Sequence, residues 1–322
     1  MSLHNRVKNR LSIVTGSQKR DTRGRIRELL WTDFVQSMPF WLPPTAMLVI
    51  FVYGSVLWNM IISLTDFQGI SRPEYRVSNF DLDMYVQMLS DPSFHSAARN
   101  TVVFMIAFTA ICLVIGLLLA LLLDRQVKFG SVFRTIYLLP FSLSYVVTGV
   151  LWLWMFNFEV GVINTLLRII GLGVFAQHWL SNPNLKLLSV ILALVWQYSG
   201  YAMVIYLATL RTIPRAHYEA AKVDGASLYT MYRKVIIPQL SSAVVSISVV
   251  LMLFTLKAFS WLYVVFGRNP GPAADILGTM MYREAFAATN WAYGAAIGTV
   301  LFGITITMLA PYLYWQYKRG EL

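Results

Sequence analysis

The chain has 322 residues, of which 57% are hydrophobic and only 13% are charged, and its mean hydropathy is +0.59. A soluble domain carries about 25% charged residues, so this composition excludes an ordinary soluble protein and indicates an integral membrane protein. The single cysteine, Cys112, excludes a disulfide within the chain. The formal net charge of +11 requires an explanation from topology or from an anionic partner.

The chain begins with a polar, basic segment at residues 1–39, which contains eight lysines and arginines but three acidic residues. A basic arm of this kind can bind nucleic acid. Basic residues directly before an apolar run are, however, typical of the cytosolic side of a membrane span. We therefore predict a cytosolic N-terminal segment at 1–39 and no nucleic-acid partner.

Six apolar segments follow, and each is long enough to cross a hydrocarbon core of about 30 Å as an α-helix. The sequence predicts an all-α polytopic membrane protein with a six-helix domain at 40–317 and a cytosolic tail at 318–322. Pro140 in the third span is expected to kink or break its helix. Gly294 and Gly298 in the sixth are expected to let another helix approach closely. The predicted spans are 43–64, 100–123, 133–157, 187–210, 239–265 and 291–316.

Lysines and arginines are distributed unequally between the two sides of this topology. If residues 1–39 are cytosolic, 18 of the 26 lie in cytosolic segments, 7 lie in external segments and Lys257 lies within a span. This excess predicts that both termini and the loop at 211–238 face the cytosol. Topology then accounts for the net charge.

Three external segments, at 65–99, 158–186 and 266–290, are long and carry aromatic residues beside turn formers. They are interpreted either as cover over a pore mouth or as a landing surface for a soluble protein that delivers substrate.

The loop between the fourth and fifth spans is far longer than the roughly 2–8 residues that usually connect two packed helices. Pro214 suits the beginning of a helix, Asp224 and Gly225 suit its end, and Ser227 suits the N-cap of a second helix through Ile236. The predicted arrangement is therefore helix, tight turn, helix. It is either a solvated amphipathic linker or a functional element.

This loop resembles the EAA loop of bacterial ABC importer permeases, whose pattern is E-A-A-x3-G-x9-I-x-L-P. The loop follows that pattern with two aliphatic replacements, Val235 for isoleucine and Ile237 for leucine. The resemblance implies the type I ABC importer permease fold, with six transmembrane helices and a cytosolic coupling helix that docks on an ATP-binding subunit. The residues that it implies in docking are Glu219, Ala220, Ala221, Asp224 and Gly225.

Other stretches resemble the maltose-type carbohydrate permeases, and this resemblance covers nearly the whole chain after about residue 40. It is carried by LTDF at 64–67, LSDPSF at 89–94 and WLSNP at 179–183. Within that branch, FRTIYLLP at 133–140 and PYLY at 311–314 resemble the glucose/mannose and α-glucoside subgroup.

The family resemblance implies a subunit that translocates a mono- or oligosaccharide across the bacterial inner membrane. The implied partners are a second homologous permease, two ATP-binding cassette ATPase subunits, an extracytoplasmic sugar-binding protein, the sugar and membrane lipid. No cofactor is expected in this chain, because ATP and Mg would be bound by the ATPase subunits. The sequence contains no G-x-x-x-x-G-K, so it has no P-loop of its own.

Lys257 is the only lysine or arginine deep within a predicted span. A charge at mid-bilayer costs about 2.5–3.5 kcal/mol on insertion scales, so Lys257 is expected to face the bundle interior or a water-filled cavity. Helical spacing predicts that it shares one face with Ser260 and Trp261. The resemblance places sugar contacts on the fourth and fifth spans, although many relatives have aspartate where Ser260 stands. The predicted contacts are Gln197, Tyr198, Tyr201, Leu253, Lys257 and Ser260.

Alternatives remain for each of these roles. The aromatic residues can serve in ordinary helix packing, and Lys257 can pair with an acidic residue of a partner subunit. A channel or secondary carrier would need no docking loop. An importer for a polyol or glycerol phosphate is also possible, but a phosphate favours two or more convergent cations. The sequence contains no H-E-x-x-H, C-x-x-C or G-x-S-x-G, and we expect no enzymatic activity and no metal site.

Overall fold

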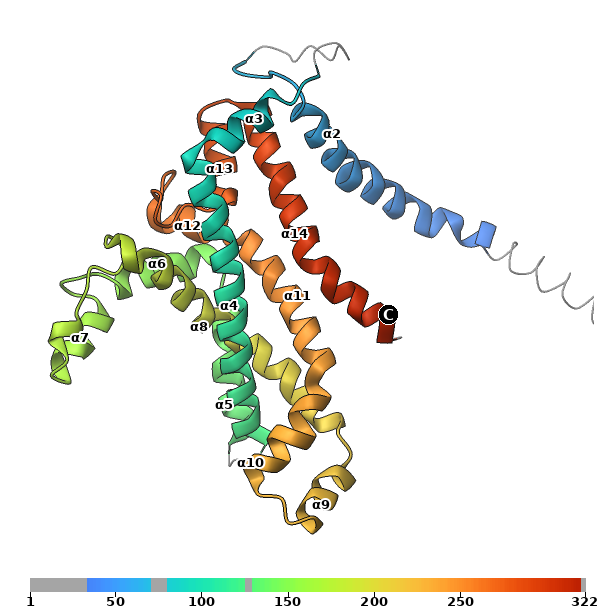
Figure 1. The fold of residues 1–322 in the computed structure, drawn as a ribbon, viewed down its shortest axis with the longest axis vertical. Helices are drawn as coiled ribbons and strands as arrows, with labels where there is room; N and C mark the ends of the chain where they lie inside the picture. Colours follow the sequence, from blue (N-terminus) through green and yellow to red (C-terminus); the bar gives the residue numbers. More distant parts are fainter. Residues whose placement is uncertain (1–33, 71–79, 125–128, 320–322) are drawn as a thin grey trace, which may run out of the picture. The chain divides into compact units, whose positions relative to one another are not determined.

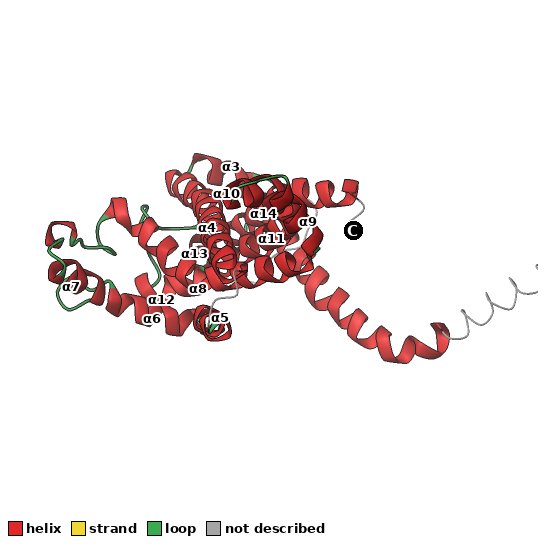
Figure 2. Ribbon diagram, turned by 90° about the horizontal axis from the view of Figure 1, so that it is seen from below, coloured by secondary structure: helices red, strands yellow, loops and turns green. Residues whose placement is uncertain are grey.

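A computed structural model describes residues 34–70, 80–124 and 129–319, and these residues form helices and loops without a strand (Figure 2). The chain divides into two units, 1–58 and 59–322. Most of the predicted N-terminal segment 1–39 and the last residues of the predicted tail lie outside the described residues. In the first unit a helix begins at Phe34 and continues to Ile62, and it is long and apolar enough to cross a membrane.

The second unit contains the remaining candidate spans (Figure 1). The described residues hold five helices long and apolar enough to cross a membrane, or six when one bent pair counts as a single span. The predicted number of spans is therefore confirmed on that count. The helices of the second unit that provide spans are α4 (Pro92–Asp124), α5 (Gly130–Leu138) with α6 (Tyr145–Met155), α8 (Pro183–Thr212), α11 (Ser241–Lys257) with α12 (Phe259–Phe266), and α14 (Trp291–Arg319).

The third span is broken, as Pro140 predicts, and its two parts are bent by 100°. After α5 the chain forms a 3₁₀ turn, η3 (Leu139–Ser142), with Pro140 in its first positions, where the missing N–H costs nothing. Leu143 then takes an extended conformation. Ser144 caps α6 by accepting a hydrogen bond from the Val147 N–H at 3.3 Å. The change of direction thus lies at Leu143 and Ser144, a few residues beyond the proline.

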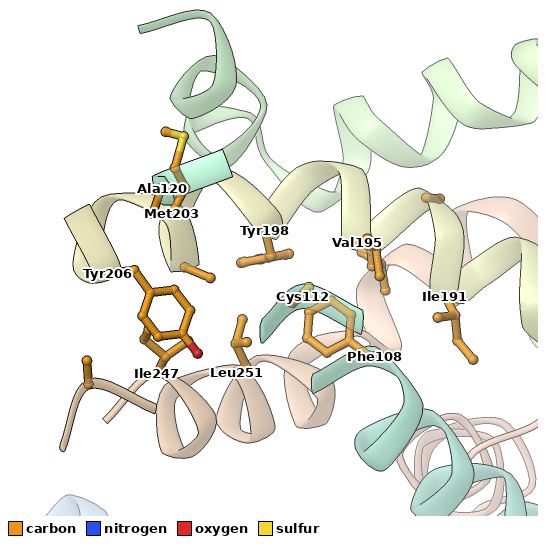
Figure 3. Close-up of a cluster of buried hydrophobic side chains, with 14 of the residues drawn as sticks. Phe108, Cys112, Ala120, Ile191, Val195, Tyr198, Met203, Tyr206, Ile247 and Leu251 are labelled. Carbon is orange, nitrogen blue, oxygen red and sulfur yellow. The ribbon is translucent and has the colours of Figure 1, made fainter. Parts of the chain in front are cut away.

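The main core is formed where α4, α8 and α11 pack against one another. Figure 3 shows Phe108 and Cys112 of α4 beside Tyr198 of α8, with Leu251 of α11 completing the cluster. All four side chains are buried. Burial of Cys112 in this apolar cluster explains why the only cysteine of the sequence lies within an apolar run.

A second cluster joins α3 (Asp83–Ser90), α13 (Leu277–Tyr282) and α14 at the end of the bundle away from α9 and α10 (Figure 1). Gly294 and Gly298 of α14 permit this packing. A Cβ at Gly294 would lie 2.6 Å from the Cβ of Ala285, and one at Gly298 would lie 3.2 Å from the sulfur of Met281. The predicted close approach at these glycines is confirmed, and it occurs within the chain.

Candidate functional site: the coupling loop and the aromatic cluster

The loop that joins α8 to α11 has the predicted helix, turn, helix structure. Its first helix, α9 (Arg215–Val223), has Pro214 as N-cap. It ends at Gly225, whose φ of +72° lies in the left-handed region that favours glycine. The Gly225 N–H donates to the Lys222 oxygen and the Ala226 N–H donates to the Ala221 oxygen, both at 3.0 Å. These two bonds form a Schellman motif, so the tight turn is fixed by backbone geometry.

The second helix of the loop is continuous with the fifth span. Ser227 caps α10 (Leu228–Met231) by accepting a hydrogen bond from the Thr230 N–H at 3.3 Å. A π-helical turn, η5 (Tyr232–Ile236), and a 3₁₀ turn, η6 (Ile237–Leu240), then lead into α11. Residues Leu228–Phe266 therefore form one helical segment of 39 residues.

Helix α9 presents an exposed face that fits a docking role. Of the five residues predicted to dock, Glu219, Ala220, Asp224 and Gly225 are exposed, but Ala221 is only 6% exposed and packs in the core. Ala221 thus anchors the helix to the bundle, and a docking contact of Ala221 stays a prediction. Sequence reasoning missed Val223, which is 87% exposed. The sequence feature that could have identified Val223 is its position as an apolar residue directly before Asp224 and Gly225, which end the helix.

The aromatic residues predicted on α8 belong to a larger cluster. The ring of Tyr201 stacks on Phe141 with centroids 5.4 Å apart, and Phe254 of α11 approaches both rings at 6.2 and 6.0 Å. Tyr198 lies deeper, 4.6 Å from Phe254, and is buried. Phe141 and Phe254 were not predicted, although Phe141 directly follows the helix-breaking Pro140 and Phe254 directly follows Leu253. Tyr201, Phe141 and Phe254 are all partly exposed, so a ligand can reach the Tyr201 ring.

Gln197 is only 1% exposed, and both polar atoms of its amide are used within the chain. Its Nε2 donates to the Leu143 oxygen at 2.9 Å, and its Oε1 accepts from the Thr148 hydroxyl at 3.1 Å. These bonds hold the broken third span against α8. Contact between Gln197 and substrate stays a prediction.

Lys257 and Leu253 lie on the exposed side of α11, and Ser260 is partly exposed. Among the residues that the structure describes, Lys257 forms no ion pair. The prediction that Trp261 shares a face with Lys257 is wrong, because Trp261 is fully buried. The helix is interrupted at Ala258, between α11 and α12, so Lys257 and Trp261 belong to different helices.

A family model described as "Binding-protein-dependent transport system inner membrane component" matches residues 112–315, more than half of the chain. The chain belongs to this family. It is accordingly a membrane component of a transport system, not an enzyme. The permease is also similar to the "Xylose/arabinose import permease protein XacH" of Haloferax volcanii. The two are 50% identical over 299 residues, which cover 92% of this chain and 93% of the relative.

Two further comparisons agree with this membership. A probable ABC transporter permease protein of Pyrococcus horikoshii is 45% identical, over 88% of this chain and 96% of the relative. The permease also resembles a chain in the crystal structure of a bacterial alginate ABC transporter in complex with an alginate pentasaccharide-bound periplasmic protein. That match has a TM-score of 0.76 and 21% identity and covers 90% of this chain and 97% of the other. It confirms the expected permease fold.

Proposed function

We propose that this permease imports a carbohydrate in an ATP-driven transporter, and that a pentose such as xylose or arabinose is the first candidate. The observation that carries the proposal is the 50% identity, along nearly the full length of both chains, to a permease named for xylose and arabinose import. The partly exposed Tyr201 ring, held on Phe141, supplies an aromatic surface for the C–H face of a sugar ring. Lys257 and Ser260 supply polar groups for sugar hydroxyls.

The proposed assembly contains a second homologous permease, two ATPase subunits and an extracytoplasmic sugar-binding protein. The exposed face of α9, with Glu219, Ala220 and Val223, docks on an ATPase subunit at the cytosolic side. The distribution of lysine and arginine in the sequence favours the same side for both termini. The small side chain of Ala220 lets the partner approach closely. ATP and Mg bind to the ATPase subunits, and closure of the ATPase dimer moves the coupling loops.

The helical segment Leu228–Phe266 supports transmission of that movement to the substrate cavity, since it connects α10 through η5 and η6 to the span that carries Lys257. The span bundle then alternates between inward-facing and outward-facing states by rigid-body motion. Sugar released by the binding protein favours the state that binds it more tightly.

A reconstituted system tests this proposal. The permease, purified with the subunits that accompany it, is placed in liposomes with the binding protein outside and ATP inside, and uptake of labelled xylose, arabinose and glucose is measured. We expect uptake of at least one sugar that requires both the binding protein and hydrolysable ATP. Uptake that is equally fast without ATP would indicate a channel or carrier instead.

A further inference from the structure

A cavity of about 770 Å³ lies beside α9 and is lined by residues of α9, α10 and the adjacent ends of α4 and α8. These four elements meet at one end of the bundle (Figure 1). Its volume falls in the range of roughly 300–1,000 Å³ that is common for small-molecule sites. Part of its wall is apolar, with Leu123, Leu210 and Met231 from three different helices. The rest is polar and mostly basic.

Three cations line this cavity: Arg211 at the end of α8, and Arg215 and Lys222 on α9. Within the described parts of the chain, none of the three takes part in an ion pair. The only carboxylate in the wall is Asp124, which accepts a hydrogen bond from the Tyr232 hydroxyl at 3.2 Å. The cavity therefore carries an excess of positive charge that nothing in the described structure neutralises.

Tyr218 adds a neutral hydrogen-bond donor to the same wall. Burial raises the pKa of Tyr218 to about 12, and the neighbouring charge of Asp124 and the phenol of Tyr232 add to the effect. Its hydroxyl therefore stays protonated at neutral pH and can donate to an anion.

The residues of the proposed docking face do not line the cavity. Arg215, Tyr218 and Lys222 follow the i, i+3, i+7 spacing of one helical face, and all three line the cavity. Ala220 and Val223 are exposed and are not part of the cavity wall. A ligand in the cavity would thus support the coupling helix without competing with an ATPase subunit for Ala220 and Val223.

We propose that this cavity binds the phosphate headgroup of an anionic membrane phospholipid. Arginine and lysine are the side chains that hold phosphate oxygens, and basic pockets between spans on the cytosolic side are typical sites for anionic lipid headgroups. The accessible apolar part of the wall distinguishes a lipid from free phosphate, because inorganic phosphate would leave the exposed Leu228 and the partly exposed Leu123 without an apolar partner. The proposal rests on the proposed function in placing this end of the bundle at the cytosolic membrane surface.

Lipid titration of the purified full chain in detergent, followed by native mass spectrometry, tests the proposal. We expect phosphatidylglycerol to bind more tightly than phosphatidylcholine with the same acyl chains. Each lysine or arginine near an anionic lipid contributes about fivefold in affinity. Lys222→Gln should therefore weaken phosphatidylglycerol binding about fivefold, and the triple change Arg211→Gln, Arg215→Gln and Lys222→Gln should weaken it about a hundredfold.

A matched control and an opposite change sharpen this test. Lys234→Gln removes an exposed cation from the same loop but outside the cavity, and should leave lipid binding at the wild-type level. Asp124→Asn removes the only carboxylate of the wall and should tighten binding severalfold. The charge-preserving variant Arg211→Lys, Arg215→Lys and Lys222→Arg should retain lipid binding. This control shows whether the triple glutamine variant fails because it lacks charge or because it does not fold.

Several results would overturn the proposal. Equal binding of both lipids, or an equal effect of Lys222→Gln and Lys234→Gln, would show that the cavity does not select an anionic headgroup. Displacement of the lipid by millimolar inorganic phosphate, with equal affinity for phosphate alone, would indicate a free-anion site. Protection of the cavity arginines only when an ATPase subunit is added would indicate a protein contact. The measurement uses neither ATP nor sugar, so its failure is distinct from failure of the proposed sugar import.

Discussion

Gln197 on α8 donates a hydrogen bond to the backbone oxygen of Leu143, at 2.9 Å, in the middle of the broken third span. Leu143 is in an extended conformation between η3 and α6, so its oxygen lacks the helical partner that it would have in an unbroken span. A free backbone polar group within a bilayer costs several kcal/mol, and side chains of neighbouring helices commonly satisfy such groups. The bond therefore explains how a 100° bend is tolerated within a span.

Replacing Gln197 with leucine should destabilise the permease, because the Leu143 oxygen loses its donor. The Thr148 hydroxyl loses one acceptor and keeps the Ser144 and Tyr145 backbone oxygens, both at 3.2 Å. An unsatisfied buried polar group costs about 1–3 kcal/mol. We expect a clearly lower melting temperature in detergent for Gln197→Leu and a smaller decrease for Thr148→Val, which removes one of the two bonds. A normal melting temperature combined with a raised KM for sugar would instead make Gln197 a substrate ligand.

Gly200 is one turn further along α8, and any side chain there should be disruptive. A Cβ at Gly200 would lie 1.9 Å from the Tyr137 backbone oxygen, closer than atoms can approach. Overpacking typically costs about 1–3 kcal/mol, and backbone yields less readily than side chains. We expect Gly200→Ala to reduce the yield of folded protein on size-exclusion chromatography. Gly303→Ala is the matched control, since a Cβ there meets nothing within 4 Å, and equal behaviour of the two variants would contradict the close packing.

Substitutions at Gly225 can test whether its left-handed backbone conformation is needed for ATP-driven uptake. Its φ of +72° costs a side-chain-bearing residue about 1–2 kcal/mol, but asparagine tolerates this region better than β-branched residues do. A Cβ at Gly225 meets no atom within 4 Å, so crowding does not confuse the comparison. We expect Gly225→Val to reduce ATP-driven uptake strongly, with normal membrane insertion, and Gly225→Asn to retain most of it. Equal uptake by the two variants would show that the turn is not needed for coupling.

Lys257 offers a direct test of the proposed substrate contacts. It is exposed and forms no ion pair among the described residues, so Lys257→Met should leave the melting temperature unchanged. If the ammonium binds sugar hydroxyls, the KM of uptake should rise at least severalfold. A fall in co-purification of the second permease, with the KM unchanged, would assign Lys257 to an inter-subunit ion pair.

Asp91 lies at the end of the bundle away from the coupling loop, and its protonation should make the thermal stability of the permease depend on pH. Burial raises the pKa of Asp91, but hydrogen bonds from the Tyr293 hydroxyl, at 2.8 Å, and from Ser93 outweigh this effect and lower the pKa below 3.8. A carboxyl group whose pKa is lower in the folded than in the unfolded state stabilises the folded state at pH values above its unfolded-state pKa. This stabilisation is lost as the pH falls through the folded-state pKa.

The expected outcome is a lower melting temperature for Asp91→Ala than for wild type at pH 7. The difference should shrink as the pH falls from about 5 to 3, because the wild type then loses the same interaction. Asp224→Ala, which removes an exposed carboxylate, is the control and should show a small difference at every pH. A difference for Asp91→Ala that does not change with pH would indicate that packing, not charge, is responsible.

The spans and the turn at Gly225 could be predicted because they depend on local signals. Long apolar runs and the pair Pro214 and Gly225 constrain the backbone whatever surrounds them. The interruption at Ala258 could not be predicted, since neither proline nor glycine marks it, and the burial of Trp261 just beyond it was likewise not predicted. Burial of Ala221 depends on which face of a short helix meets the bundle, and only tertiary packing decides this.

The start of α4 shows a second kind of limit. Hydropathy places the span at 100–123, but the helix begins at Pro92, since polar residues continue a helix beyond the apolar run. Similarly, no feature of the sequence predicts that Gln197 donates a hydrogen bond to the Leu143 oxygen at the break in the third span. The two residues are 54 positions apart, and the need for the bond arises only once the third span is bent.

The helical segment Leu228–Phe266 has a mechanical consequence for the proposed transport cycle. With 39 residues at 1.5 Å each, its length along the backbone is about 58 Å, more than the thickness of a bilayer. In the proposed cycle, a displacement of its loop end would therefore be transmitted to the substrate region along one stretch of backbone. We expect this segment to bend where its regular α-helical hydrogen bonding is interrupted, at Tyr232–Leu240 and at Ala258.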